Sequence, residues 1–212
     1  CVHIEATLEA MPETYRKLGR LLGREERGEA LAEYCERIYG RTQDIMERVG
    51  ESRADVLYCL GTEGLNVLAK GSYHAELIDM LANNVAVLDE PSSKGTGNEV
   101  DMEQLLLWDP DYLVFSPEVD LESIAGDSSW QQMKAVSQGN YVKVPFGPFN
   151  WMGIPPSVQR YLGLIWLPAV LYPDHVEYDV YEEVAEYFRL FYHSELSREL
   201  FDELTKDSFI KR

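Results

Sequence analysis

Between Asp55 and Pro145 the sequence alternates short apolar runs with amphipathic segments, and this alternation constrains the fold more than any other feature. The apolar runs are predicted to be buried strands at residues 55–61, 85–89, 111–116 and 140–145. The segments between them have helical spacing at residues 72–82, 101–109 and 128–139. Repeated strand–helix–strand units predict an α/β fold, with a parallel sheet of about four to five strands flanked by helices and right-handed crossovers.

A long amphipathic helix is predicted before this region, over residues 24–49. Its apolar positions recur at steps of three and four: Leu31, Tyr34, Cys35, Ile38, Ile45, Met46 and Val49. A shorter helix is expected over residues 11–22, with Pro12 in its first turn and Gly23 at its end. The last third is predicted to be largely helical, over residues 157–172 and 181–204.

The charge balance argues against two classes of partner. The 212 residues include 37 acidic and 19 basic side chains, for a formal net charge of -18. Such a surface repels nucleic-acid phosphates and anionic lipids, so neither is expected to bind. Its simplest role is to keep the protein in solution, although it also suits a basic partner or a cation.

Cysteine and histidine give no sign of a metal site or a resident cofactor, and none is expected. Cys35 and Cys59 lie in apolar patterns and are predicted to be small core residues. Cys1 is either a lipid-modified end or simply the first residue. The glycines lack nucleotide-binding spacings, and no serine stands in a nucleophile elbow. His74, near a strand-end loop, is interpreted as a surface histidine, with a ligand role as the alternative.

Unusual composition gathers where the predicted strands end. Ligands of open parallel sheets bind outside the carboxyl ends of the strands. The segments at those ends are 61–72, 90–98, 116–124 and 146–156. The last of them begins "FGPFNWMGIPP", a run of aromatic, methionine and proline residues. It is read either as a packed connection or as the lining of a site.

Several stretches together resemble the class of ABC-transporter substrate-binding proteins that capture iron-siderophores, haem, cobalamin and, in some members, molybdate or tungstate. The most specific is "EVDMEQLLLWDPDYLVFS" (99–116), which is similar to the family's Val-Ser/Asp-x-Glu-x-Leu and Asp-Pro-Asp-hydrophobic pattern. The others, in chain order, are "LEAMPETYRKLGRLLGREERGEALAEYCERI", "GLNVLAKGSYHAELIDMLANNVAV", "WQQMKAVSQGNYVKVP" and "PPSVQRYLGLIWLPAVLYPD". The resemblance covers nearly the whole chain, although Asn83–Asn84 stands where the family often has Gly-Gly-x-Asn.

The resemblance implies a division of the chain. Residues 1–23 resemble the tail of an N-terminal lobe that is absent here, followed by a short helix. Residues 24–50 resemble the inter-lobe backbone helix, and residues 51–212 the C-terminal ligand-binding lobe. By itself this lobe would provide one wall of a two-walled cleft, and it is expected to be monomeric.

The resemblance and the strand-end rule together suggest the residues of that wall. The expected ligand-binding residues are Glu63, Asn66, Lys70, Phe149, Asn150, Trp151, Met152 and Arg160. Each has a structural alternative: core packing for Phe149 and Trp151, a surface ion pair for Arg160, and a solvated side chain for Lys70. Glu103 matches the family glutamate that docks to permease arginines, and its alternative role is to favour its own helix through the dipole.

The implied function is binding rather than catalysis. The chain is expected to bind an iron chelate such as a siderophore, or haem or cobalamin, and to deliver it to an ABC permease in the membrane. The alternatives are a molybdate or tungstate oxyanion bound by the same family, an enzyme or metallocluster scaffold on a related two-lobed fold, and an interaction domain without a ligand. The expected location is exported, either periplasmic or lipid-anchored at the cell surface.

Overall fold

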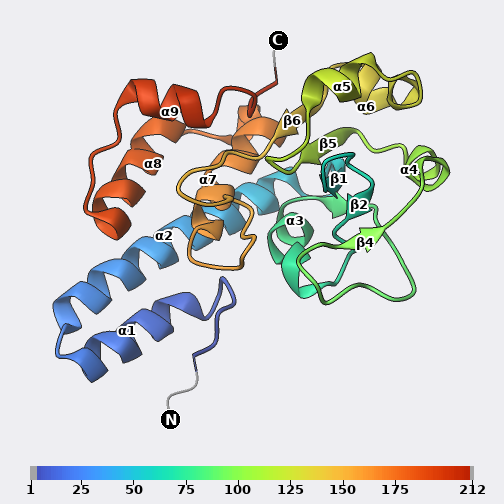
Figure 1. Ribbon diagram of the computed structural model, residues 1–212. Helices are drawn as coiled ribbons and strands as arrows, with labels where there is room; N and C mark the ends of the chain where they lie inside the picture. The colour runs from blue at the N-terminus through green and yellow to red at the C-terminus, as the bar shows by residue number, and fades with distance from the viewer. Residues whose placement is uncertain (1–3, 211–212) are drawn as a thin grey trace.

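The computed structural model of the protein describes residues 4–210, so a role for Cys1 lies outside the described residues. A sheet carries helices on both faces, and a long helical hairpin runs away from it (Figure 1). Within the described residues the sheet has six strands, most of them parallel. The predicted α/β fold class is therefore confirmed.

The hairpin consists of the two helices expected near the start of the chain, α1 (Met11–Leu22) and α2 (Glu25–Val49). Gly23 adopts a left-handed backbone conformation between them, with φ at 62°, which glycine reaches without steric cost. Close approach of the helices depends on two further glycines. A Cβ atom added to Gly28 would lie 2.9 Å from Cα of Gly19 and 2.7 Å from the carbonyl oxygen of Tyr15.

The central strands are β1 (Asp55–Leu60), β5 (Tyr112–Phe115) and β6 (Tyr141–Lys143), which pair in parallel in that order. A short strand β3 (Asn83–Asn84) also pairs in parallel with the start of β1. Two more short strands, β2 (Asn66–Val67) and β4 (Asn98–Glu99), extend the sheet in antiparallel fashion beyond the end of β1. These antiparallel strands were not expected from the alternating pattern.

The prediction of a strand over residues 85–89 is wrong, because the pairing of β3 with β1 stops at Asn84. The side chain of Asn84 bonds to the backbone instead, accepting from the Ala86 N–H at 3.1 Å and donating to the Leu68 carbonyl at 3.0 Å. These bonds turn the chain away from the sheet and leave Val87 66% exposed. A local pattern of apolar residues could not reveal this competition.

The helices between the strands are shorter than predicted. The structure divides them into 3₁₀ and α segments: η1 (Tyr73–Ala75) and α3 (Glu76–Leu81), then η2 (Trp130–Gln132) and α6 (Lys134–Ser137). The helix expected after Asp101 is present as α4 (Met102–Trp108), and the Asp101 carboxylate caps it by accepting from the Gln104 N–H at 2.8 Å. The short helix α5 (Leu121–Gly126) was not predicted.

Alternate residues of β1 face two separate hydrophobic cores. Val56, Tyr58 and Leu60 pack into the larger core with α2, α3 and the C-terminal helices. Leu57 and Cys59 pack into the smaller core with α4, α5 and α6. Cys35 lies in the larger core, where burial raises its thiol pKa to about 12, so the prediction that Cys35 and Cys59 are core residues is confirmed.

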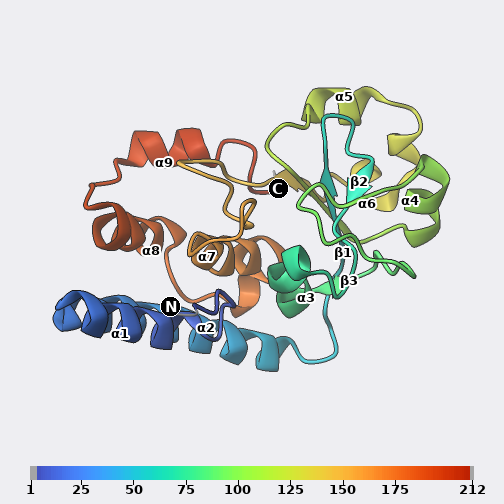
Figure 2. The ribbon, with the colours of Figure 1, turned by 60° about the horizontal axis from the view of Figure 1, so that its bottom comes forward.

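The C-terminal third is helical as expected. Its elements are α7 (Arg160–Leu171), η3 (Pro173–His175), α8 (Val180–Tyr187), the π-helical turn η4 (Phe188–Tyr192) and α9 (Arg198–Leu204). The helix α7 is buried nearly all round, with α2 and α3 packed against it. Figure 2 shows the α1–α2 hairpin alongside α7 and α8, on the side away from α4, α5 and α6. Among the described residues, no helix combines the length and apolarity needed to cross a membrane.

A buried cluster ties the start of the chain to α3 and α7. The Arg160 guanidinium, whose side chain is 3% exposed, forms an ion pair with Glu76 and donates to the Ala6 carbonyl. The other carboxylate oxygen of Glu76 accepts from the Leu8 N–H at 2.9 Å, and the Tyr161 hydroxyl donates to the Leu8 carbonyl at 2.6 Å. We call these residues, Ala6, Leu8, Glu76, Arg160 and Tyr161, the Arg160 cluster.

The hairpin geometry predicts opposite effects for two glycines of the same helix. Gly28→Ala should lower the free energy of unfolding by about 1–3 kcal/mol, because the new methyl group would force α1 and α2 apart. Gly40→Ala has nothing within 4 Å of the added Cβ and should raise stability by up to about 1 kcal/mol through helix propensity. Urea unfolding of the two variants checks this, and equal effects would contradict the close contact.

The Arg160 cluster predicts a large loss of stability when its cation is removed. Arg160→Ala should lower the free energy of unfolding by about 3 kcal/mol or more, because Glu76 would lose its partner in a largely buried setting. Arg20→Ala is the control, since Arg20 pairs with Glu13 at the surface and should change stability little. If chemical denaturation gave similar values for both variants, the cluster would not have the stabilising role assigned to it.

Candidate functional site

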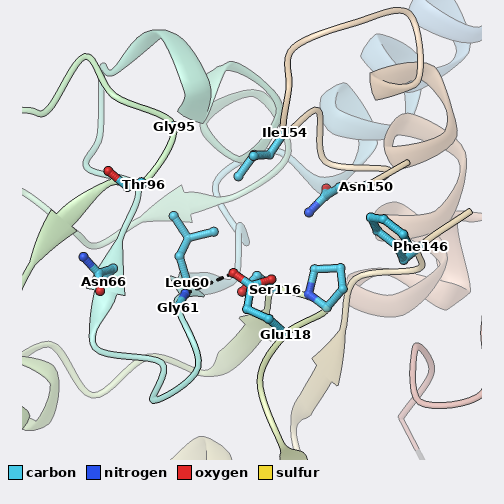
Figure 3. A pocket seen from close by; sticks show the side chains of 11 residues that line it. Leu60, Gly61, Asn66, Gly95, Thr96, Ser116, Glu118, Phe146, Asn150 and Ile154 are labelled. Carbon is cyan, nitrogen blue, oxygen red and sulfur yellow. Dashed lines mark hydrogen bonds between the residues drawn. The ribbon is translucent and has the colours of Figure 1, made fainter. Parts of the chain in front are cut away.

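A pocket with a volume of about 630 Å³ lies beyond the carboxyl ends of β1 and β5 (Figure 3). This size is within the range usual for small-molecule sites. Segments that are far apart in the sequence contribute to it. Its lining residues are Leu60, Gly61, Asn66, Gly95, Thr96, Ser116, Pro117, Glu118, Phe146, Asn150 and Ile154. The pocket thus lies at the edge of the sheet that the strand-end rule selects.

Ser116 is the most informative polar residue of the pocket. It directly follows β5, and its own N–H donates to the Cys59 carbonyl at 2.9 Å, which fixes it at the end of the sheet. The residue is only 1% exposed, yet its Oγ atom has no hydrogen-bond partner among the described residues. A buried hydroxyl without a partner is costly in a protein interior. Ser116 is thus a pocket residue whose hydroxyl has unused hydrogen-bonding capacity.

Glu118 supplies a carboxylate at the same edge. Its Oε1 accepts from the Gly61 N–H at 3.2 Å, which joins the end of β1 to the loop after β5 (Figure 3). The side chain is exposed, and a carboxylate can accept several hydrogen bonds. The bond to Gly61 thus positions Glu118 without using all of its accepting capacity.

Two asparagines complete the polar side of the pocket. Asn150 is buried: its Oδ1 accepts from the Met152 N–H at 2.7 Å and its Nδ2 donates to the Tyr58 hydroxyl at 3.0 Å. Burial raises the pKa of Tyr58 well above its ordinary value, so the phenol stays protonated. Asn66, at the start of β2, is half-buried and bordered by Gly61. Asn150 is thus held rigidly, while the Asn66 amide remains open to a ligand.

The apolar side of the pocket comes from Leu60, Phe146 and Ile154. Phe146 is 54% exposed, which is unusual for a large aromatic side chain. An isolated β-bridge between Phe146 and Asn150 closes the turn after β6 and sets the direction of both residues. The pocket consequently offers an apolar surface beside its hydrogen-bonding groups.

The aromatic stretch after β6 is divided between surface and core. Trp151 is fully buried and its Nε1 donates to the Gly147 carbonyl at 3.1 Å, while Met152 is 2% exposed. Phe149 is 53% exposed, and neither it, Trp151 nor Met152 lines the pocket. The position of Trp151 agrees with the core-packing alternative. The stretch is therefore a packed connection, and through Phe146 and Asn150 it is also part of the pocket wall.

The charged residues expected in the site lie elsewhere. Arg160 belongs to the buried cluster with Glu76 and Ala6. Lys70 lies near the opposite end of the sheet: its Nζ is 3.4 Å from Oδ1 of Asn83, whose amide donates to Asp55, the first residue of β1. Glu63 is exposed in the turn between β1 and β2 and does not line the pocket.

Of the eight expected ligand-binding residues, the structure places Asn66 and Asn150 in the pocket. Ser116 and Glu118 line the pocket but were not among the expected ligand-binding residues, although both lie in a segment selected by the strand-end rule. Their position among the first polar residues after a buried strand was the sequence signal that could have identified them. Thr96 and Gly95 had only the weaker signal of a glycine-rich loop.

Glu103 lies on a separate surface, in the first turn of α4. The helix α4 is at the opposite end of the molecule from the α1–α2 hairpin (Figure 1). The acidic residues Glu99 and Asp101 line the same shallow depression, beside Leu107, which is 79% exposed. The surface around Glu103 is thus acidic and includes an exposed apolar side chain.

Metal-ligating groups do not converge anywhere in the part of the chain that the structure describes. Within residues 4–210, no group of three or more His, Cys, Asp or Glu side chains is placed to hold a metal ion. A metal bound by these residues alone would lack the ligand number that proteins normally provide.

Comparison with known proteins gives the same fold. A model of the periplasmic binding protein family matches residues 4–146. An ABC transporter solute binding protein from Sulfurospirillum deleyianum superposes with a TM-score of 0.85 at 32% identity, over 92% of this chain and 61% of that one. A periplasmic solute binding protein from Veillonella parvula gives 0.79 at 25% identity, over 95% and 62%.

A more distant likeness concerns the fold alone. The molybdate periplasmic binding protein MolA of Haemophilus influenzae, in its molybdate-bound form, has a TM-score of 0.67 at 18% identity, over 90% of this chain and 58% of that one. None of the curated proteins matches the chain. The chain thus spans about three fifths of the length of the solved structures it resembles.

The family match covers more than half of the chain, and the solved structures share its sheet and helices over nearly all of its length. The chain belongs to the periplasmic binding protein family, the solute-binding proteins of ABC importers.

Proposed function

We propose that this chain is the C-terminal ligand-binding part of the solute-binding component of an ABC importer, and that it binds an organic metal chelate such as a siderophore, haem or cobalamin. The pocket beyond β1 and β5 forms one wall of the ligand site. The unpartnered, buried hydroxyl of Ser116 is the observation that carries this proposal, because a ligand in the pocket would satisfy it. Asn66, Asn150, Glu118 and Phe146 complete the wall.

The domain roles belong to the same proposal. Residues 24–50 act as the backbone helix between two lobes, residues 51–212 as the ligand-binding lobe, and residues 1–23 as the tail of a preceding lobe with a short helix. The packing of α2 along α7 supports a rigid connection. A second lobe would supply the opposite wall of the cleft, and the isolated lobe would remain monomeric.

We assign supporting roles to the expected residues outside the pocket. Trp151 and Met152 pack beneath Asn150 and hold its turn, and Arg160 fixes the entry of the chain into the lobe. Binding rather than catalysis is favoured because, within the described residues, the pocket lining contains one carboxylate and no histidine or cysteine. An exported location, periplasmic or lipid-anchored at the surface, follows from this role.

The binding proposal predicts a specific effect of one hydroxyl. In the natural full-length polypeptide, Ser116→Ala should weaken binding of the chelate about threefold to tenfold, the contribution of one buried hydrogen bond. The free energy of unfolding should stay the same or rise, because the removed group has no protein partner. Isothermal titration with ferric hydroxamate and catecholate chelates, haemin, cobalamin and molybdate identifies the ligand and measures the change.

Ser72→Ala is the matched control for this experiment. Ser72 also has a buried Oγ without a partner, but it does not line the pocket. Its substitution should leave affinity unchanged. Absence of binding heat with every compound would contradict the proposed function, and so would equal losses of affinity in the two variants.

The permease role predicts a loss of transport without a loss of binding. Glu103→Ala should lower the rate of chelate uptake by cells about fivefold, because it removes a charge that orients the protein on permease arginines. Ligand affinity should not change. Glu199→Ala is the control, since Glu199 occupies the same first-turn position of α9 on another surface. A drop in affinity for Glu103→Ala, or an equal drop in uptake for both, would refute the docking role.

A further inference from the structure

The charges around the pocket restrict the class of ligand further than its location does. Among the eleven described residues that line the pocket, Glu118 is the single charged one, and lysine, arginine and histidine are absent (Figure 3). Anions are normally recognised by cationic side chains or by converging N–H groups. The side chains of this pocket wall instead carry a negative charge.

Some of the hydrogen-bond donors at this edge are already used by carboxylates. The Gly61 N–H, at the end of β1, donates to Glu118. At the start of α5, the Asp120 carboxylate accepts from the Glu122 N–H at 3.1 Å and from the Ser123 hydroxyl at 2.7 Å. An anion arriving here would have to displace a carboxylate from its donors.

The two cationic side chains that were expected in the site are also committed elsewhere. Arg160 is buried against Glu76 and the Ala6 carbonyl, and Lys70 lies toward the other end of β1. Moving the Arg160 guanidinium toward the pocket would leave Glu76 without its partner in a largely buried position. Neither side chain can therefore make the pocket wall positively charged without a large cost in free energy.

A bare metal ion is no better suited to this wall. The described residues include no group of three metal-ligating side chains, in the pocket or elsewhere. By contrast, Leu60, Phe146 and Ile154 give an apolar surface for an organic body, beside Ser116 and Asn66 for its polar groups. A chelate that brings its own metal ligands meets both conditions.

We infer that this wall selects a neutral or positively charged organic chelate, with Glu118 facing its cationic or hydrogen-bond-donating part, and that it disfavours oxyanions and polyanionic chelates. The inference rests on the proposed function and narrows its ligand class. The formal net charge of -18 acts in the same direction, because it concentrates cations near the protein and repels anions.

The test compares ligands of different charge in the natural full-length polypeptide. The probes are ferrioxamine B, a ferric hydroxamate with a protonated amine, ferric enterobactin, a polyanionic catecholate, and sodium molybdate. Ferrioxamine B should bind more tightly than either anion, and its affinity should fall as the salt concentration rises.

Glu118→Gln separates charge from shape, because its amide oxygen can still accept from the Gly61 N–H. This variant should weaken ferrioxamine B about threefold to fivefold and flatten the salt dependence, as expected for a partly screened charge pair. Glu122→Gln is the control, since Glu122 lies in the same region outside the pocket and should leave both quantities unchanged.

The outcomes distinguish the inference from the function beneath it. The inferred preference for neutral or cationic chelates is overturned if molybdate or ferric enterobactin binds more tightly than ferrioxamine B, or if Glu118→Gln leaves the affinity unchanged. In either case, a loss of affinity in Ser116→Ala would still support the pocket as the ligand site. Binding of none of the probes counts against the pocket function and the charge class together.

Discussion

The ion pair between Arg160 and Glu76 is the contact on which the rest of this structure depends. It joins the first turn of α7 to the first turn of α3, and both side chains also hold the backbone of residues 6–8. Because α7 is buried in the core, the contacts at its first turn anchor α3 and residues 6–8 to the core. A buried charge is tolerated only when it is paired and its remaining donors are satisfied, and the Arg160 cluster meets that requirement.

The same pair accounts for the position of Arg160 outside the pocket. Arg160 was expected to bind the ligand. In the folded chain its guanidinium instead holds residues 6–8, α3 and α7 together. The pocket lining offers one carboxylate, two amides, the hydroxyls of Thr96 and Ser116, and an apolar surface. The cation expected in the pocket thus has a structural role in the folded chain, and the pocket lining is left with a carboxylate as its charged group.

Much of the fold could be predicted because its pattern is local. The spacing of apolar residues determines α1, α2 and the three central strands, and Asp101 marks the start of α4. The strand predicted at 85–89 failed because the Asn84 side chain competes for backbone groups that a ladder would need. The short strands β2 and β4 were missed because each has only two residues, too few to show an alternating pattern.

For the site, the amino-acid pattern alone indicates which edge of the sheet is chemically unusual, since parallel strands end together and the segments after them are rich in polar, glycine and aromatic residues. Only the tertiary structure decided which of those residues face the pocket. Trp151 is buried and Arg160 is paired with Glu76, whereas Ser116 and Glu118 line the pocket. The reason is physical: whether a side chain is free or engaged depends on partners distant in the chain, and no local pattern records those partners.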